Sequence, residues 1–103
     1  MTAAVLSRRA GRELNRALQW IARENPIAAQ GFLDAVTRAT ERIGQYPRIG
    51  TVRPDLTPNA SYRFVVLPAY PYLIAYNADH DPPRIVRIVH GARDLPRLLR
   101  DLR

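Results

Sequence analysis

Arginine and histidine are the residue types in this chain that are best suited to chemistry on an anion. All sixteen basic residues are Arg, and nine residues are acidic, so the formal net charge is +7. A guanidinium group binds carboxylates and phosphates through two parallel hydrogen bonds, but it keeps its proton and cannot act as a general base. Residues 84–103 are the most basic segment, with six Arg and two Asp. We expect this charge either to be a solvated face or to bind an acidic partner.

The two histidines are the side chains whose ordinary pKa lies near neutrality. His80 stands between Asp79 and Asp81 in a proline-bounded turn, and no second cluster of ligand residues accompanies it. A solvated turn is therefore expected there rather than a metal site. His90 ends an apolar run close to Arg93 and is the acid–base candidate of the chain. The alternative is a histidine that fixes the turn at the edge of a sheet.

The composition limits the remaining classes of function. A chain of 103 residues that is 47% hydrophobic predicts a single globular domain over residues 1–103. Cysteine is absent and no glycine-rich phosphate loop is present, so neither a metal nor a cofactor is expected. No apolar run approaches the ~18 residues that suggest a membrane span. Residues 1–6 do not resemble a signal peptide, because basic residues follow rather than precede them. We expect a cytoplasmic protein without a membrane partner.

Two amphipathic helices are expected to form most of the N-terminal half. After a short apolar strand over residues 1–6, Ser7 is placed to cap a helix over 8–24. Asn25 and the proline after it are placed to cap a second helix over 26–45. Apolar residues recur in both segments at spacings of three and four. Helices joined by so short a connection predict an antiparallel hairpin.

The C-terminal half changes from helical to β periodicity. Residues with a β preference predict strands over 62–67, 72–77 and 84–90, separated by turns that contain proline. A short helix is expected over 94–102, with Asp94 as its cap. The order strand, helix, helix, three strands, helix predicts an α+β fold. In this fold the helical hairpin packs on a largely antiparallel sheet.

Four short motifs follow one another along nearly the whole chain. They are Ile21-Ala22-Arg23-Glu24-Asn25-Pro26 followed by Ala28, Ala29 and Phe32; Tyr46-Pro47-Arg48-Ile49-Gly50 followed by Arg53; Tyr62-Arg63 followed by Tyr70-Pro71-Tyr72-Leu73-Ile74-Ala75-Tyr76; and Val89-His90-Gly91-Ala92-Arg93-Asp94-Leu95-Pro96. Each motif alone is weak, but together and in this order they resemble the ParE-type toxins of the RelE/ParE toxin–antitoxin superfamily.

This resemblance implies a fold that agrees with the pattern above, and it also implies a function. Members of the superfamily are growth-inhibiting toxins that a cognate antitoxin neutralises. A ParD-like antitoxin with an acidic neutralising segment, bound in a toxin–antitoxin hetero-oligomer, is the implied partner. ParE-type members inhibit DNA gyrase and block replication, whereas RelE-type members cut messenger RNA in the ribosome.

The residues favour the ParE branch over the RelE branch. RNA cleavage by a 2′-hydroxyl needs a proton acceptor, a proton donor and cations that stabilise the phosphorane. Arg63, Arg87 and Arg93 could supply the cations, but His90 is the only credible acid–base group. RelE-type members commonly place a Tyr or His after the terminal basic residue, where this chain has Asp94. We therefore expect a DNA gyrase inhibitor that binds without catalysis. The alternatives are a ribosome-dependent mRNA endoribonuclease that uses His90 and Arg93, and a non-toxic, decayed homologue that acts as a binding module.

Two sets of contact residues are expected. The antitoxin-binding set lies on the flanks of the helices and comprises Arg12, Arg16, Trp20, Arg23 and Leu33. The target-binding set comprises Arg63, Arg87, Arg93, Arg97 and Arg100. Two of these residues have alternative roles. Trp20 lies off the apolar stripe of its helix, so it either covers a seam between helices or faces a partner. Arg63 either contacts the target or pairs with Asp94 or another carboxylate.

Overall fold

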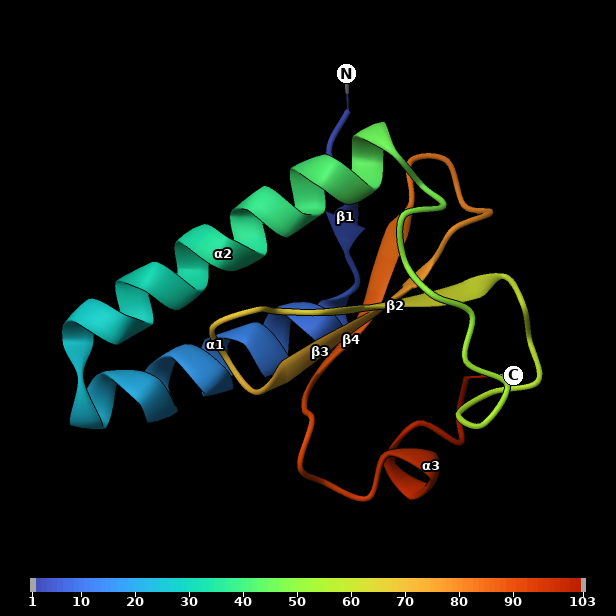
Figure 1. Cartoon of the computed structure of the whole chain (residues 1–103). Coiled ribbons are helices and arrows are strands. Elements are labelled where there is room, and N and C mark those ends of the chain that lie inside the picture. The colour runs from blue at the N-terminus through green and yellow to red at the C-terminus, as the bar shows by residue number, and fades with distance from the viewer. Residues whose placement is uncertain (1, 103) are drawn as a thin grey trace.

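The computed structural model describes residues 2–102, which form a four-stranded mixed sheet with a pair of long helices (Figure 1). The predicted α+β fold is confirmed. In chain order the elements are β1 (Val5–Leu6), α1 (Arg8–Glu24), α2 (Pro26–Gln45), β2 (Tyr62–Val66), β3 (Tyr72–Asn77), β4 (Arg84–His90) and α3 (Leu95–Leu98).

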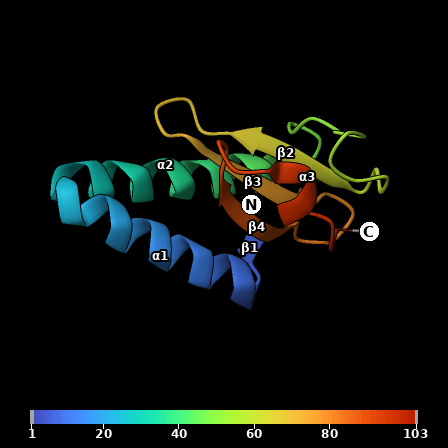
Figure 2. The same ribbon diagram turned by 90° about the horizontal axis from the view of Figure 1, so that it is seen from below.

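Side-chain caps set the beginnings of both long helices. The Ser7 hydroxyl accepts a hydrogen bond from the amide of Ala10 at 3.1 Å, and the Asn25 side-chain oxygen accepts one from Ala28 at 3.1 Å. Each cap satisfies an amide that the first helical turn leaves without a partner. Asn25 also ends α1, so one residue joins the two helices. Figure 2 shows α1 and α2 side by side, with the strands and α3 toward the end opposite their connection.

The sheet has the strand order β1-β4-β3-β2. β1 runs parallel to β4, and the other neighbouring strands are antiparallel. The register between β3 and β4 shifts, because Ala75 pairs with Arg87 whereas the next residue, Tyr76, pairs with Ile85. β4 therefore carries one extra residue at this point, which is a β-bulge. β1 pairs with only two residues of β4, so the outer edge of β4 beyond Ile85 lies beside α1.

Buried side chains form two clusters, one on each face of the sheet. Successive strand residues point to opposite faces, and in β3 Leu73 belongs to one cluster and Ile74 to the other. The α1–α2 hairpin covers the face of Ile74, where Phe32 is fully buried. The opposite face is covered by the loop after α2 and by the C-terminal residues Leu99 and Leu102. Both faces of the sheet are thus shielded from solvent, which explains why β4 is apolar along most of its length.

Two predicted strands are shorter in the structure. The strand expected over residues 1–6 is limited to Val5–Leu6, and Met1 lies outside the described residues. The strand expected over 62–67 ends at Val66. The strands at 72–77 and 84–90 have the expected bounds.

The C-terminal helix is also shorter than the predicted 94–102. It ends at Leu98 because Leu99 and Leu102 turn inward to fill the second cluster instead of extending a helix. Asp94 precedes this helix, but its side chain makes no capping hydrogen bond. Within residues 2–102, no helix combines the length and the apolar character that crossing a membrane requires.

Candidate binding site

A hollow of about 520 Å³ opens between α1 and the end of β4, and we call it the α1–β4 hollow. Arg16 and Trp20 line it from α1, Tyr72 and His90 from the sheet, and Arg93 from the segment after β4. Aromatic rings and two guanidinium groups therefore border the same space. The other lining residues are Glu13, Ala17, Ile88, Val89 and Leu98.

The α1 side of this hollow belongs to a polar and aromatic face of the helix. Arg12, Arg16, Trp20 and Arg23 follow one another at spacings of four, four and three, which places them on one side of a helix. Trp20 is 65% exposed, so it is presented to solvent and does not cover a seam between helices. The guanidinium carbon of Arg23 lies 5.8 Å from the centre of the Trp20 ring, within cation–π range.

His90 is held in the turn that follows β4. Its Nδ1 accepts a hydrogen bond from the amide of Ala92 at 3.1 Å, and its ring packs edge-on against Tyr72 with 5.2 Å between ring centres. Burial raises the pKa of the Tyr72 phenol above its ordinary value of 10.0, and the charge of Arg93 opposes that rise. The phenol is therefore neutral at physiological pH. These contacts favour the turn-fixing role of His90.

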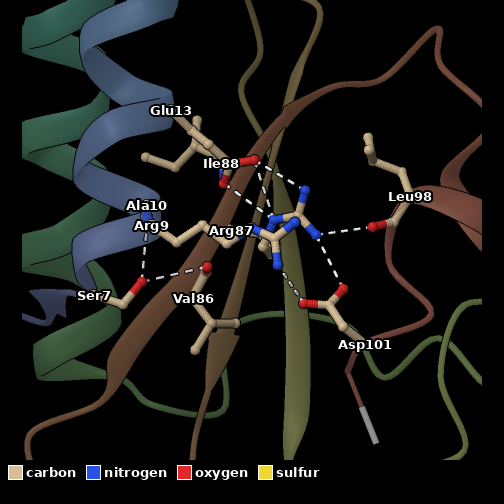
Figure 3. Close-up of polar contacts among 9 residues, drawn as sticks. All are labelled: Ser7, Arg9, Ala10, Glu13, Val86, Arg87, Ile88, Leu98 and Asp101. Atoms are coloured by element: carbon tan, nitrogen blue, oxygen red, sulfur yellow. Dashed lines mark hydrogen bonds and ion pairs between the residues drawn. The ribbon is translucent and has the colours of Figure 1, made fainter.

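Arg87 does not lie on the surface. It is 2% exposed, and its Nε and Nη2 donate to the Glu13 carboxylate of α1 at 3.0–3.1 Å (Figure 3). Its Nη1 donates to the carbonyl of Leu98 at 2.8 Å and to the Asp101 carboxylate at 3.1 Å. Burial among partners of its own chain therefore argues against the predicted contact between Arg87 and a target.

Sequence reasoning missed Glu13, although the sequence contains a signal for its role. Glu13 follows Ala10 by three residues and precedes Ala17 by four, but it also follows Arg9 by four and precedes Arg16 by three, so it lies at the border between the apolar and the basic faces of α1. Its carboxylate also accepts the amide of Ile88 at 3.0 Å. That amide lies on the edge of β4 that the short β1 leaves unpaired. Glu13 thus completes the sheet edge and balances the buried charge of Arg87.

A second hollow, of about 420 Å³, lies along the C-terminal segment, and we call it the tail hollow. Arg9 of α1 lines it together with Arg93, Arg97 and Arg100. Three of the five predicted target-binding residues are therefore brought together. Arg93 and Leu98 line both this hollow and the α1–β4 hollow, so the two sites are adjacent. The remaining lining residues are Asp94 and Asp101.

Comparison with known proteins identifies the family of this chain. Residues 4–95 match the family model described as the ParE toxin of type II toxin-antitoxin system, parDE. The chain belongs to the ParE toxin family. A solved structure of the chromosomal ParDE TA system from P. aeruginosa is similar to this ParE-family chain, with a TM-score of 0.70 and 18% sequence identity. The match covers 87% of this chain and 96% of that chain, and at this identity it supports the fold alone. No curated protein sequence matches.

Two other predicted contact residues of this ParE-family toxin, Arg63 and Leu33, line neither of these two hollows. Arg63 of β2 donates through Nη1 to the carbonyl of Gly50 at 2.9 Å and to that of Arg48 at 3.4 Å. It therefore supports the loop after α2 and does not pair with Asp94. Leu33 is half-buried on α2 and lines neither hollow.

The ParE-family toxin has a third hollow, of about 720 Å³, between α2 and the edge strand β2. It is mainly apolar, with Ile49 and Val66 exposed at its surface and Arg38 and Arg42 along α2. None of the predicted contact residues lines it. Among the described residues there is also no group of three or more His, Cys, Asp or Glu side chains that could hold a metal ion.

Proposed function

We propose that this ParE-family toxin inhibits growth by binding DNA gyrase with the basic surface around the tail hollow, without making or breaking a bond. Because gyrase acts on DNA, this function would place the toxin in the cytoplasm. The observation that carries the proposal is the gathering of Arg93, Arg97 and Arg100 with Arg9 around one hollow. Clustered guanidinium groups bind carboxylates or phosphates and accelerate encounter with an acidic partner.

The surroundings of the titratable groups support binding rather than catalysis. The Nδ1 of His90 is occupied by the amide of Ala92. The Tyr72 phenol has a raised pKa because it is buried, so it is a poor proton acceptor at physiological pH. Arg87, the expected cation on β4, is buried in an ion pair with Glu13. Of the predicted phosphorane-stabilising cations, Arg93 alone lines the α1–β4 hollow.

An acidic segment of the cognate antitoxin fits the α1–β4 hollow. Its apolar side chains would pack on Trp20 and Tyr72, and its carboxylates would pair with Arg16 and Arg93. Because Arg93 also lines the tail hollow, an antitoxin seated there borders the target-binding surface. Neutralisation would then follow from covering or occupying the arginines that the target needs, within a toxin–antitoxin hetero-oligomer.

Supercoiling by purified gyrase tests this function. The wild-type chain is expected to inhibit supercoiling or to trap cleaved DNA, and addition of the antitoxin should relieve the effect. The double variant Arg93→Gln, Arg97→Gln should lose at least about tenfold in potency, since a charge-assisted contact contributes about 1.5–3 kcal/mol. The control Arg8→Gln, Arg84→Gln removes the same charge from exposed positions that line none of the three hollows. Equal loss in both double variants, or no inhibition by folded wild-type protein, would refute the proposal.

One observation favours a second candidate, the ribosome-dependent endoribonuclease. His90 and Arg93 line the same hollow, as an acid–base group and a phosphate-binding cation would. This activity predicts codon-phased cuts in translated messages that disappear in His90→Ala. Intact messages during growth arrest would exclude it.

A further inference from the structure

The C-terminal segment, residues 91–102, has little secondary structure to hold it in place. Its helix α3 spans four residues, and the hydrogen bonds within its backbone are local. Its position must therefore come from contacts with the rest of the molecule. Apolar anchoring comes from Leu99 and Leu102, which are buried in the second cluster. A polar anchor comes from the Thr57 hydroxyl, which donates to the carbonyl of Leu102.

Arg87 supplies a third anchor, and it has a geometric property that the other two lack. One side of its guanidinium group binds the Glu13 carboxylate of α1, and the other side binds the carbonyl of Leu98 and the carboxylate of Asp101 (Figure 3). The guanidinium is planar and its N–H directions are fixed. The orientation of the C-terminal segment is therefore tied to that of α1. Asp101 also pairs with Arg9 of α1 at 2.7 Å, which adds a second link between the same elements.

The anchored positions alternate with the basic positions of the tail hollow. Leu98 directly follows Arg97, and Asp101 directly follows Arg100. A shift at either anchor would move the neighbouring arginine relative to Arg9 and Arg93. Apolar contacts with leucine side chains are non-directional and tolerate such shifts, whereas the fork of hydrogen bonds does not.

We infer that Arg87 is a positioning residue, which fixes the spacing of the target-binding arginines by tying the C-terminal segment to α1 through Glu13 and Asp101. The inference rests on the proposed function, because it takes Arg93 and Arg97 as target contacts. Arg87 touches no target itself. Its effect on inhibition passes through the segment that it holds.

The experiment uses the full chain with Asp101→Ala and Asp101→Asn, because Asp101 is half-exposed and its replacement leaves both clusters intact. The asparagine variant loses the charge but keeps an oxygen that accepts from Arg87. The control is Asp55→Ala, which removes an exposed carboxylate paired with Arg53 and changes the net charge by the same amount. Three quantities are measured: amide hydrogen exchange in residues 95–102, gyrase inhibition, and affinity for the antitoxin segment.

Asp101→Ala is expected to speed exchange in residues 95–102 and to weaken gyrase inhibition, each by about tenfold, as loss of a hydrogen bond to a charged group implies. Exchange in α2 and affinity for the antitoxin should stay within about threefold of wild type. Asp101→Asn should recover most of the inhibition, and Asp55→Ala should match wild type. Because Asp101→Ala makes the chain more basic, a purely electrostatic surface would bind an acidic target more tightly, which is the opposite result.

Two outcomes would overturn the inference: unchanged exchange in Asp101→Ala, or faster exchange with full inhibition. A variant Arg87→Lys, which keeps the charge but cannot bridge both carboxylates, should reproduce the Asp101→Ala result if it folds. Failure of the wild-type chain to inhibit gyrase would instead refute the proposed function. Growth arrest at matched levels of folded protein then replaces gyrase inhibition as the readout. The inference still requires that Asp101→Ala is weaker than Asp101→Asn and that Asp55→Ala matches wild type.

Discussion

The Tyr76 hydroxyl and the Gly50 amide join the middle of the sheet to the turn after α2. The hydroxyl accepts the amide hydrogen of Gly50 at 2.8 Å and donates its own hydrogen to the carbonyl of Pro47 at 2.7 Å. Tyr76 is fully buried, so both bonds are shielded from water. A side chain at position 50 would not fit, because an added Cβ would lie 2.8 Å from the Tyr76 hydroxyl. A strand residue therefore holds the turn together with the turn's own hydrogen bond from the Ile49 amide to the Tyr46 carbonyl.

Replacing this hydroxyl is predicted to destabilise the fold. Tyr76→Phe leaves a buried amide and a carbonyl without a partner, which costs about 1–3 kcal/mol. The free energy of unfolding, measured by urea denaturation, should fall by that amount. Tyr46→Phe is the control, because Tyr46 is 57% exposed and an exposed change of this kind stays within about 0.5 kcal/mol. Equal effects of the two variants would show that the Tyr76 bonds contribute nothing to stability.

The pKa of Tyr76 predicts how stability changes at high pH. Burial raises this pKa above its ordinary value of 10.0, against smaller opposing effects of the Gly50 hydrogen bond and the Arg63 charge. The unfolded chain then loses the proton at lower pH than the folded chain. The contribution of Tyr76 to stability is complete below about pH 10 and is lost as pH rises through the folded-state pKa. Above pH 10 the free energy of unfolding should fall more steeply for wild type than for Tyr76→Phe. Parallel pH profiles would contradict this assignment.

Two helical glycines should respond to alanine in opposite directions. A Cβ at Gly44 would contact the carbonyl oxygen of Thr2 and lie 2.7 Å from the Cα of Ala3. Backbone cannot move as a side chain does, so Gly44→Ala should cost about 1–3 kcal/mol. A Cβ at Gly11 meets nothing within 4 Å, so Gly11→Ala should gain up to about 1 kcal/mol from helix propensity. The urea midpoint should be lower than that of wild type for Gly44→Ala and higher for Gly11→Ala. The reverse order would contradict the prediction.

Local signals predict the two long helices and the strands at 72–77 and 84–90, but they neither limit the C-terminal helix nor place the buried charges. Ser7 and Asn25 cap the long helices as expected, since each cap bonds only three residues ahead. The sequence predicts Arg87 as a surface contact, because its partner Glu13 lies 74 residues away in the chain and local spacing does not reveal the pair. An arginine in an otherwise apolar strand indicates burial with a carboxylate, but it does not say which carboxylate.

The sequence predicts only part of the candidate site, because the rest depends on contacts between segments that are distant in the chain. The polar face of α1 follows from residue spacing, whereas its meeting with the end of β4 depends on tertiary packing. The sequence predicts Arg16 and Trp20 as antitoxin contacts and Arg93 as a target contact, yet all three line one hollow. The third hollow has no sequence signal of its own, because its apolar residues come from four separate segments.

The exposure of Trp20 predicts that it contributes more to antitoxin binding than any other α1 residue. An exposed indole beside Arg16 and Arg23 can bury a large apolar area against a partner that also carries acidic groups. Trp20→Ala should weaken antitoxin binding by at least about thirtyfold, the loss of about 2 kcal/mol typical of such a residue. Stability should change little, because the ring is largely in solvent.

Fluorescence anisotropy of a labelled antitoxin segment measures this loss, and the emission of Trp20 gives a second signal because it is the only tryptophan. The control is Ile27→Ala, which removes an 84% exposed apolar side chain outside all three hollows. It should bind as wild type does. If the two variants bind equally well, or if the Trp20 emission is unchanged on binding, the antitoxin does not occupy the α1–β4 hollow. The polar face of α1 would then need a different partner.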